Sequence, residues 1–242
     1  MIIKPELFRH KKVKSLQSTR IGGTSKKPYN DMNMGVFGQD TNAAHNVEIF
    51  SKINNLPHSL KFLNQQHTNK VIELIKEPNE QGEIIADACF TRAPKVICSV
   101  LSADCLPVLI ADKYATVVAA VHCGWKGLYS DILKKTIQKI EVNNSDLQCW
   151  LGPCISYKPY RVDEDFRNKF VKKQAQFAHC FYRDKKRNWH ADLKKIAVTQ
   201  LESLGVKEIA QSPYCSHDNK NLFFSYRRDQ ETGRMASIIW LE

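Results

Sequence analysis

The sequence predicts one domain in which strands and helices mix, an α/β or α+β fold. Short apolar, β-branched runs with the length of strands recur along the 242-residue chain. Segments with the apolar spacing of amphipathic helices lie between these runs. No stretch rich in Pro, Gly or Ser divides the chain, so residues 1–242 are expected to form a single domain.

Each expected element follows from a local pattern. The clearest strand, residues 115–122, is an apolar run that ends at His122. The helix over 42–54 follows from an apolar stripe of Val47, Ile49, Phe50 and Ile53. The strands expected in chain order are 16–20, 60–63, 71–75, 95–101, 107–111, 115–122, 148–151, 208–210 and 237–241. The helices expected are 42–54, 128–140, 164–174 and 192–204.

Composition restricts the class of protein. No apolar run approaches the roughly 20 residues of a membrane helix, and no apolar segment of a secretory signal follows Met1. The eight cysteines show no C-x-x-C spacing and mostly lie in apolar runs, which is typical of free thiols in a reducing compartment. We therefore expect a cytoplasmic protein that does not interact with membranes.

The net charge of +11 raises the question of nucleic acid. The basic residues are spread along the chain, and the two short clusters, 10–14 and 183–187, contain none of the interleaved aromatic residues of a single-strand platform. A solvated basic surface is therefore expected, with nucleic acid unlikely as a partner. An anionic small substrate would also benefit from this field. The oligomeric state does not follow from the sequence.

The most informative segments are Ser102–Pro107, Ala120–Gly127 and the loop that contains His67. Each places a chemically capable side chain at the end of an apolar run. Cys105, His67 and His122 would supply one thiolate and two imidazoles, a donor set that zinc accepts with a fourth position open for water. Asp104 could orient a ligand or act as a general base.

Two other interpretations of the same residues stay open. Cys105 could act as a thiolate nucleophile with His122 or His67 as its base. A histidine at a strand end can also be a satisfied structural group, and a cysteine among apolar residues is commonly packing. Metal content separates the first interpretation from the zinc site.

Ordered motifs extend along nearly the whole chain, at residues 18–25, 32–35, 66–67, 86–88, 102–109 and 121–127. In this order they are similar to T-R-x-G-G-x-S, N-L-G, Q-x-H, A-D-A, A-D-C-x-P-V-L and H-A-G-W-R-G. Residues 151–155 and 224–229, with Gly233-Arg234 after them, complete the pattern. With these motifs the chain resembles the laccase-domain proteins, also called multicopper polyphenol oxidases of the bacterial purine nucleoside phosphorylase type.

The resemblance implies a four-layer α/β/β/α sandwich with mixed sheets, an α+β fold. It also implies a metal site at His67, Cys105 and His122. The activities described for such proteins include phosphorolysis of adenosine, inosine, guanosine and methylthioadenosine, deamination of adenosine, copper-dependent phenol oxidation and a role in cleaning up peptidoglycan precursors.

Some positions depart from the family pattern. Val47 stands where the helix usually carries Arg after Asn, and Lys126 replaces the Arg of H-A-G-W-R-G. Arg161 stands where a Glu is usual, and Pro159 where a Cys is common. The three metal ligands are all present.

The leading hypothesis is a zinc-dependent enzyme that acts on purine nucleosides, with phosphate as the second substrate. Cys105, His67, His122 and Asp104 are the expected catalytic residues. Arg20, Asn33 and Arg228 are the expected substrate-binding residues. The alternatives are a copper-dependent phenol oxidase, a cysteine hydrolase that acts on a peptidoglycan precursor, and a binding protein without catalytic activity. Copper could also occupy a site of soft thiolate and imidazole ligands.

Overall fold

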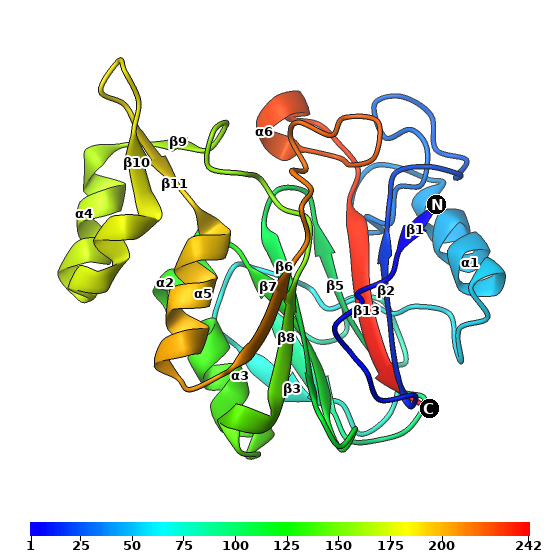
Figure 1. Ribbon diagram of the computed structural model, residues 1–242. Helices are drawn as coiled ribbons and strands as arrows, with labels where there is room; N and C mark the ends of the chain where they lie inside the picture. Colours follow the sequence, from blue (N-terminus) through cyan, green and yellow to red (C-terminus); the bar gives the residue numbers. More distant parts are fainter.

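A computed structural model describes all 242 residues and contains two large β-sheets stacked face to face, with helices outside them (Figure 1). The four-stranded sheet has the order β1-β2-β13-β5 and is antiparallel throughout. The six-stranded sheet has the order β12-β8-β6-β7-β4-β3 and is mixed, because the outer pairs β12/β8 and β3/β4 are parallel.

The strands of the four-stranded sheet are β1 Ile2–Ile3, β2 Val13–Ser18, β5 Ile97–Ser102 and β13 Met235–Leu241. Those of the six-stranded sheet are β3 Val71–Glu73, β4 Ala88–Thr91, β6 Leu106–Asp112, β7 Val118–Cys123, β8 Leu147–Leu151 and β12 Glu208–Gln211.

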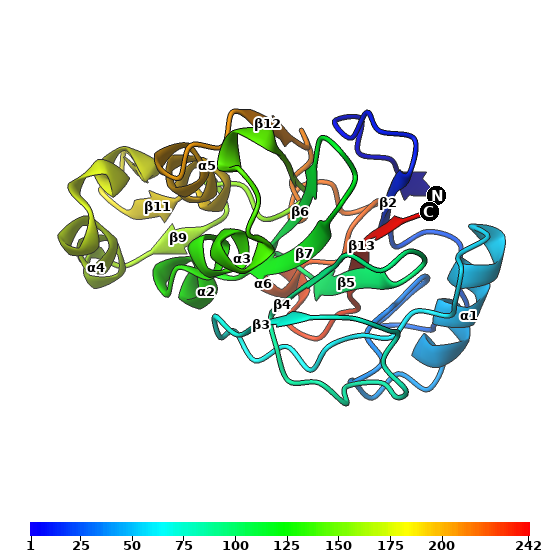
Figure 2. The same ribbon diagram turned by 90° about the horizontal axis from the view of Figure 1, so that it is seen from below.

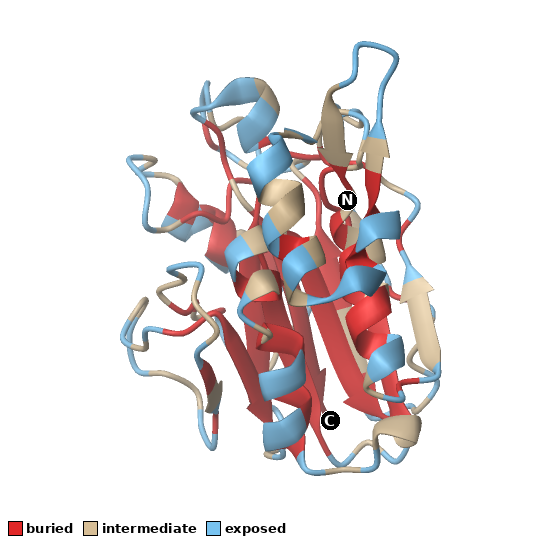
Figure 3. Cartoon of the chain, turned by 90° about the vertical axis from the view of Figure 1, so that its left-hand side faces the viewer, coloured by how far each residue is buried: buried red, intermediate tan, exposed pale blue.

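Side-chain alternation along the strands explains the layers. In β6, Val108 and Ile110 face the helices on one side, whereas Leu109 and Ala111 face the other sheet. In β13, Ile239 belongs to the same inter-sheet core, and Ile238 packs outward. All residues of the central strands β5, β6, β7 and β13 are buried, as Figure 3 shows. The expected four-layer α/β/β/α sandwich is confirmed, and of its two large sheets only the six-stranded one is mixed.

The outer layers are unequal (Figure 2). The helix α1, Ala43–Ile53, covers the four-stranded sheet through Val47 and Phe50. Three helices cover the six-stranded sheet: α2 Trp125–Tyr129, α3 Ile132–Ile140 and α5 Leu193–Ser203. None of these helices has the length and apolarity needed to cross a membrane.

Beside these helices lies a small unit that the sequence did not predict as a sheet. It consists of α4, Glu164–Lys173, and a three-stranded antiparallel sheet of order β10-β11-β9. Its strands are β9 Arg161–Val162, β10 Phe181–Arg183 and β11 Trp189–Ala191. Strands of two or three residues are too short to show a periodic pattern. Two short 3₁₀ turns, Asn144–Asp146 and Ala175–Cys180, and the short helix α6, Tyr226–Asp229, complete the structure.

Several expected elements are corrected. Leu60, Phe62 and Leu63 are buried, but residues 60–63 form no strand, because the side chain of Gln81 takes the place of a neighbouring strand. Its Oε1 accepts from Phe62 N at 2.8 Å, and its Nε2 donates to Leu60 O at 2.7 Å. The helix expected over 128–140 is interrupted at Asp131, whose backbone is left-handed with φ 62°. The exposed Ile53 does not belong to the buried stripe of α1. The first long strand ends at Ser18 rather than Arg20.

Candidate functional site

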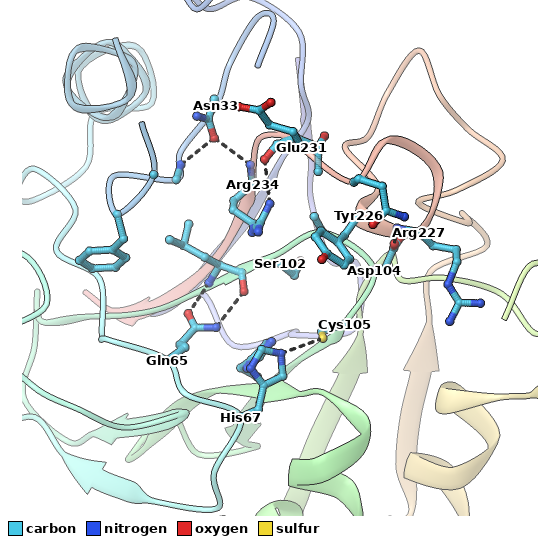
Figure 4. Close-up of a pocket in the computed structure, with 18 of the residues that line it drawn as sticks. Asn33, Gln65, His67, Ser102, Asp104, Cys105, Tyr226, Arg227, Glu231 and Arg234 are labelled. Carbon is cyan, nitrogen blue, oxygen red and sulfur yellow. Dashed lines mark hydrogen bonds between the residues drawn. The ribbon is translucent and has the colours of Figure 1, made fainter. Parts of the chain in front are cut away.

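The three expected metal ligands come together at the edge where both large sheets end. Figure 4 shows two of them, His67 and Cys105, side by side. Cys105 directly precedes β6, and His122 is the next-to-last residue of β7. Register pairs Leu106 with Cys123, so these two ligands are neighbours across the sheet. His67 reaches them from the loop before β3, with its Nε2 3.7 Å from Cys105 Sγ. The ligand atoms of all three lie within 4.8 Å of one another.

A buried carboxylate, Asp87, holds the two histidines in place. Its Oδ1 lies 2.9 Å from His122 Nδ1 and also accepts from His67 N at 2.9 Å. Its Oδ2 accepts from the amide and the hydroxyl of Thr68 at 2.7 and 2.8 Å. Since an ionised carboxylate only accepts, His122 donates through Nδ1 and presents Nε2 to the site. The expected set of site residues lacked Asp87, although the A-D-A segment contained it.

The Asp87 carboxylate is charged in this environment. Burial opposes its ionisation, but the hydrogen bonds from His122 and Thr68 outweigh burial and lower the pKa of Asp87 to about 2.

Gln65, in the same loop as His67, binds this loop to the four-stranded sheet. Its Nε2 donates to Leu101 O at 2.9 Å and its Oε1 accepts from Leu101 N at 2.7 Å, which clips the loop to β5.

The backbone is tightly constrained at the site. His67 and Asp104 have left-handed backbones, with φ 58° and 92°, a conformation that costs a non-glycine residue roughly 1–3 kcal/mol. Gly124 lies next to the side chains of His67 and Cys105. A Cβ atom on Gly124 would stand 2.8 Å from His67 Cδ2 and 3.2 Å from Cys105 Sγ. Only glycine therefore lets the two ligands approach the turn before α2 this closely.

Proximity changes the protonation of the thiol and of the buried imidazole. Burial would raise the pKa of Cys105, but the charge and hydrogen bonds of His122, together with His67, lower the pKa to about 6. Burial would lower the pKa of His122, but the Cys105 thiolate and the Asp87 carboxylate raise it to about 9. A metal ion binds a thiolate and a neutral imidazole, so metal binding here would use the thiolate already formed and release the proton from His122 Nε2.

The residues fit a metal ion. A thiolate and two imidazoles are a donor set of catalytic zinc sites, and the carboxylate on the second nitrogen of His122 is the partner that such histidines have. His67 is exposed, Cys105 is half-buried and His122 is buried, so the cluster opens toward solvent on one side. This cluster could hold a metal ion and leave a position open to the pocket.

A pocket of about 880 Å³ lies in front of the cluster, which is within the range of roughly 300–1,000 Å³ typical of small-molecule sites. His67, Cys105 and His122 all line it. Its other walls come from the ends of both sheets, from α6 and from the loop after β2. They include the aromatic residues Tyr29, Phe37, Trp125, Tyr160 and Tyr226.

Asp104 and Asn33 line this pocket as expected, but both are bonded to the chain. Asp104 Oδ1 accepts from Ser216 Oγ at 2.6 Å, and Oδ2 accepts from Ser225 Oγ at 3.0 Å and from Arg227 N at 2.6 Å. Asp104 therefore ties the segment around α6 to the β5–β6 turn. Asn33 Oδ1 accepts from Gly35 N and Arg234 N, both at 2.8 Å.

The other two expected substrate-binding residues do not line the pocket. Arg20 donates to the carbonyls of Asn30 and Lys220, and its guanidinium lies 4.7 Å from the centre of the Phe224 ring. Arg228 donates to three backbone carbonyls and to the carboxylate of Asp229. The structure thus assigns both arginines to holding the chain. Sequence patterns reveal a positive charge but not how its N–H groups are used.

Arg234 is the arginine that the expected set of site residues lacked. It lines the pocket between Asn33 and Ser102 (Figure 4). The signal for it was present, since Gly233-Arg234 stood beside the last motif of the resemblance.

The departures from the family pattern lie in different environments. Val47 packs into the core between α1 and the four-stranded sheet. Lys126 and Arg161 are exposed, and neither lines the pocket. Pro159 lies outside the pocket lining, but its carbonyl accepts from Arg227 Nη1 at 3.1 Å.

Comparisons with known proteins agree with this fold. The chain is 36% identical over 242 residues to a protein of Escherichia coli named purine nucleoside phosphorylase YfiH, covering 99% of this chain and 98% of that protein. It is 36% identical over 244 residues to a purine nucleoside phosphorylase of Haemophilus influenzae, covering 99% of each chain. The crystal structure of Neisseria meningitidis protein NMB0706 superposes with a TM-score of 0.92 at 34% identity, covering 100% of this chain and 99% of that one.

A family model described as multi-copper polyphenol oxidoreductase laccase matches residues 14–242. This match covers all three metal-ligand candidates, Asp87 and every residue that lines the pocket. The chain therefore belongs to the laccase-like multi-copper polyphenol oxidoreductase family.

Proposed function

We propose that this protein is a purine nucleoside phosphorylase with a zinc ion held by His67, Cys105 and His122. The observation that carries the proposal is the convergence of these three ligand atoms, within 4.8 Å, on the wall of the large pocket. The name of relatives 36% identical over nearly the full chain supports the reaction.

The pocket suits a nucleoside because its wall combines flat aromatic side chains with polar groups. Trp125 and Tyr160 are half-buried, and Phe37 and Tyr226 stand at the exposed rim. Aromatic rings of this kind stack on a planar purine base, and nearby amides such as that of Asn64 fit its ring nitrogens and the ribose hydroxyls.

In the proposed reaction a phosphate oxygen forms a bond to C1′ of the ribose as the bond from C1′ to the purine nitrogen breaks. The bonding electrons leave with the base, which takes up a proton. The products are the free base and ribose 1-phosphate. When bound, zinc supplies Lewis acidity at the pocket wall. Asp87 orients His122 for this task through its hydrogen bond to Nδ1.

The finer parts of the proposal concern substrates and roles. Adenosine, inosine, guanosine and methylthioadenosine are the proposed nucleosides, and deamination of adenosine is proposed as a second activity. Cys105, His67 and His122 act as metal ligands. For Asp104 we propose a positioning role in place of the expected proton transfer, because both of its carboxylate oxygens accept hydrogen bonds from the chain.

The test incubates zinc-loaded protein with each nucleoside, with and without phosphate, and separates the products by chromatography. Release of the purine base only in the presence of phosphate, lost in Cys105→Ala, supports the proposal. Inosine formed from adenosine supports deamination. If no nucleoside gives a free base and adenosine gives no inosine, the proposal is contradicted.

The same samples address the alternatives. Oxidation of a phenol by copper-loaded protein, without nucleoside turnover, would favour the copper oxidase. Cleavage of a peptidoglycan-precursor amide by metal-free protein, with a trapped thioester on Cys105, would favour the cysteine hydrolase.

A further inference from the structure

We propose that the end of the pocket formed by Arg234, Ser102 and Thr232 is an oxyanion subsite that binds inorganic phosphate. Its role as the phosphate site of phosphorolysis rests on the proposed function. The binding of phosphate does not depend on it.

Arg234 is positioned with part of its guanidinium free. Its backbone N donates to Asn33 Oδ1 at 2.8 Å, and its Nη1 donates to the carbonyls of Thr232 and Gly233 at 2.8 and 3.0 Å. Its Nε and Nη2 make no hydrogen bond within the chain. One edge of the guanidinium is therefore fixed by the protein, and the other edge faces the pocket (Figure 4). A fixed planar fork of this kind matches two phosphate oxygens.

Two buried hydroxyls beside Arg234 lack any partner. Ser102 and Thr232 are 2% and 6% exposed, and neither Ser102 Oγ nor Thr232 Oγ1 makes a hydrogen bond. Both residues line the pocket. Register places Met235 opposite Ser102, so Arg234 stands beside Ser102 where β5 and β13 meet. A buried hydroxyl without a partner costs free energy unless a ligand supplies one.

The donors at this end of the pocket select an anion rich in acceptor atoms. Arg227 is the other arginine in the pocket wall, but its Nη1 donates to the carbonyls of Pro159 and Arg161, and its guanidinium lies 5.1 Å from the centre of the Tyr160 ring. Glu231, at the exposed rim, accepts from Tyr29 Oη at 2.5 Å. Both arginines keep Nε and Nη2 without a partner, but Arg227 is exposed, whereas Arg234 is half-buried and stands beside the two unpartnered hydroxyls. Its charge and the two hydroxyls complement a tetrahedral oxyanion.

Kinetics with zinc-loaded protein test the assignment. Arg234→Gln keeps side-chain length but removes the charge, and we expect the KM for phosphate to rise about 10- to 100-fold, since hydrogen bonds to charged groups have this effect. The KM for the nucleoside stays within a factor of about 2. Ser102→Ala raises the KM for phosphate about 2- to 10-fold without lowering the melting temperature, because the lost hydroxyl has no partner in the chain.

The matched control is Arg161→Gln, which removes one exposed positive charge close to Tyr160 but makes no side-chain contact with the pocket. Its KM for phosphate should match that of the unaltered protein. A rise equal to that of Arg234→Gln would show a general field effect and overturn the subsite.

Calorimetric titration with inorganic phosphate alone separates this inference from the proposed function. Binding to the unaltered protein that is lost in Arg234→Gln supports the subsite even if no nucleoside is cleaved. Binding that persists in Arg234→Gln but disappears when zinc is removed would place phosphate on the metal and overturn it. Phosphorolysis with an unchanged KM for phosphate in Arg234→Gln would keep the proposed function and overturn the subsite.

Discussion

At the scale of single residues, the site depends on groups whose environment is unusual. Cys105 is a thiol between two imidazoles, Asp87 is a fully buried carboxylate, and Gly124 is in contact with two ligand side chains. Each of these features changes a protonation state or a contact that the sequence alone does not set, so its effect can be measured.

Cys105 should be the most reactive of the eight cysteines once metal is removed. Because its pKa is lowered to about 6, its thiolate fraction, and hence its rate of alkylation by iodoacetamide, should rise with pH and level off above about pH 7. Cys154, whose pKa burial raises to about 12, should stay unmodified over this range. Mass spectrometry of chelator-treated protein at several pH values measures both rates.

The variant His122→Ala provides the comparison for this profile. Loss of the imidazole should move the midpoint for Cys105 upward, toward the value of about 8.5 for a free thiol. A midpoint near 8.5 in the unaltered protein would show that the two imidazoles do not stabilise the thiolate.

Gly124→Ala should abolish metal binding while the fold remains. The added methyl group would stand 2.8 Å from His67 Cδ2 and 3.2 Å from Cys105 Sγ, so the two ligands must separate. Elemental analysis should find about one zinc ion per chain before the change and little after it. The control is Gly38→Ala, where the added methyl group makes only an ordinary contact of 3.5 Å with Gly35 O. Full zinc content in Gly124→Ala would refute the constraint.

At the scale of elements, the turn between β5 and β6 links the two large sheets to the C-terminal segment. Asp104 provides the link through Ser216, Ser225 and the amide of Arg227. Ser225 also caps α6, since its Oγ accepts from Arg228 N at 3.3 Å. The Asp104 carboxylate therefore holds the α6 wall of the pocket together with the arginines of α6, Arg227 and Arg228, which donate to carbonyls of neighbouring segments.

Asp104→Asn should loosen this wall. The side-chain nitrogen of Asn cannot accept a hydrogen bond, so the donors that now bind one of the two carboxylate oxygens lose their acceptor. We therefore expect a loss of about 1–3 kcal/mol in the free energy of unfolding. Hydrogen exchange should become faster at the Arg227 amide, whereas zinc content should not change. Loss of activity with unchanged exchange would instead identify Asp104 as the proton carrier.

At the scale of the whole molecule, the metal site joins parts that are far apart in the sequence. The loop of His67, the start of β6 and the end of β7 meet only when the six-stranded sheet is complete. A metal ion that binds only this folded arrangement must stabilise the whole fold by linkage.

Removal of metal should therefore lower the melting temperature. Free zinc at 100 times its dissociation constant adds about 2.7 kcal/mol to the free energy of unfolding. For a chain of this length that corresponds to a rise of about 5–10 °C. Scanning calorimetry with zinc and with a chelator measures the difference. Cys105→Ala should have the same melting temperature with zinc and with chelator. If zinc raised its melting temperature as much as that of the unaltered protein, the stabilising ion would bind elsewhere.

The sequence by itself determined the order of the central strands along the chain, the helices α1, α4 and α5, and the identity of the three ligand candidates. These follow from local patterns: apolar runs of strand length, helical spacing, and polar side chains placed where apolar runs end. The sequence also predicted the ends of these elements within a few residues, as for α1 between Asn42 and Asn54. Local chemistry suffices for these features because each depends on near neighbours in the chain.

Only the tertiary structure decided which polar side chains act on the pocket. Arg20, Arg228 and Arg234 carry the same charge, yet the first two donate to chain carbonyls outside the pocket, and Arg234 keeps free N–H groups inside it. Asp87 became visible as the partner of His67 and His122 only when their loops met. The physical reason is that the partners of a hydrogen bond are set by contacts between segments distant in the sequence, which no local pattern records.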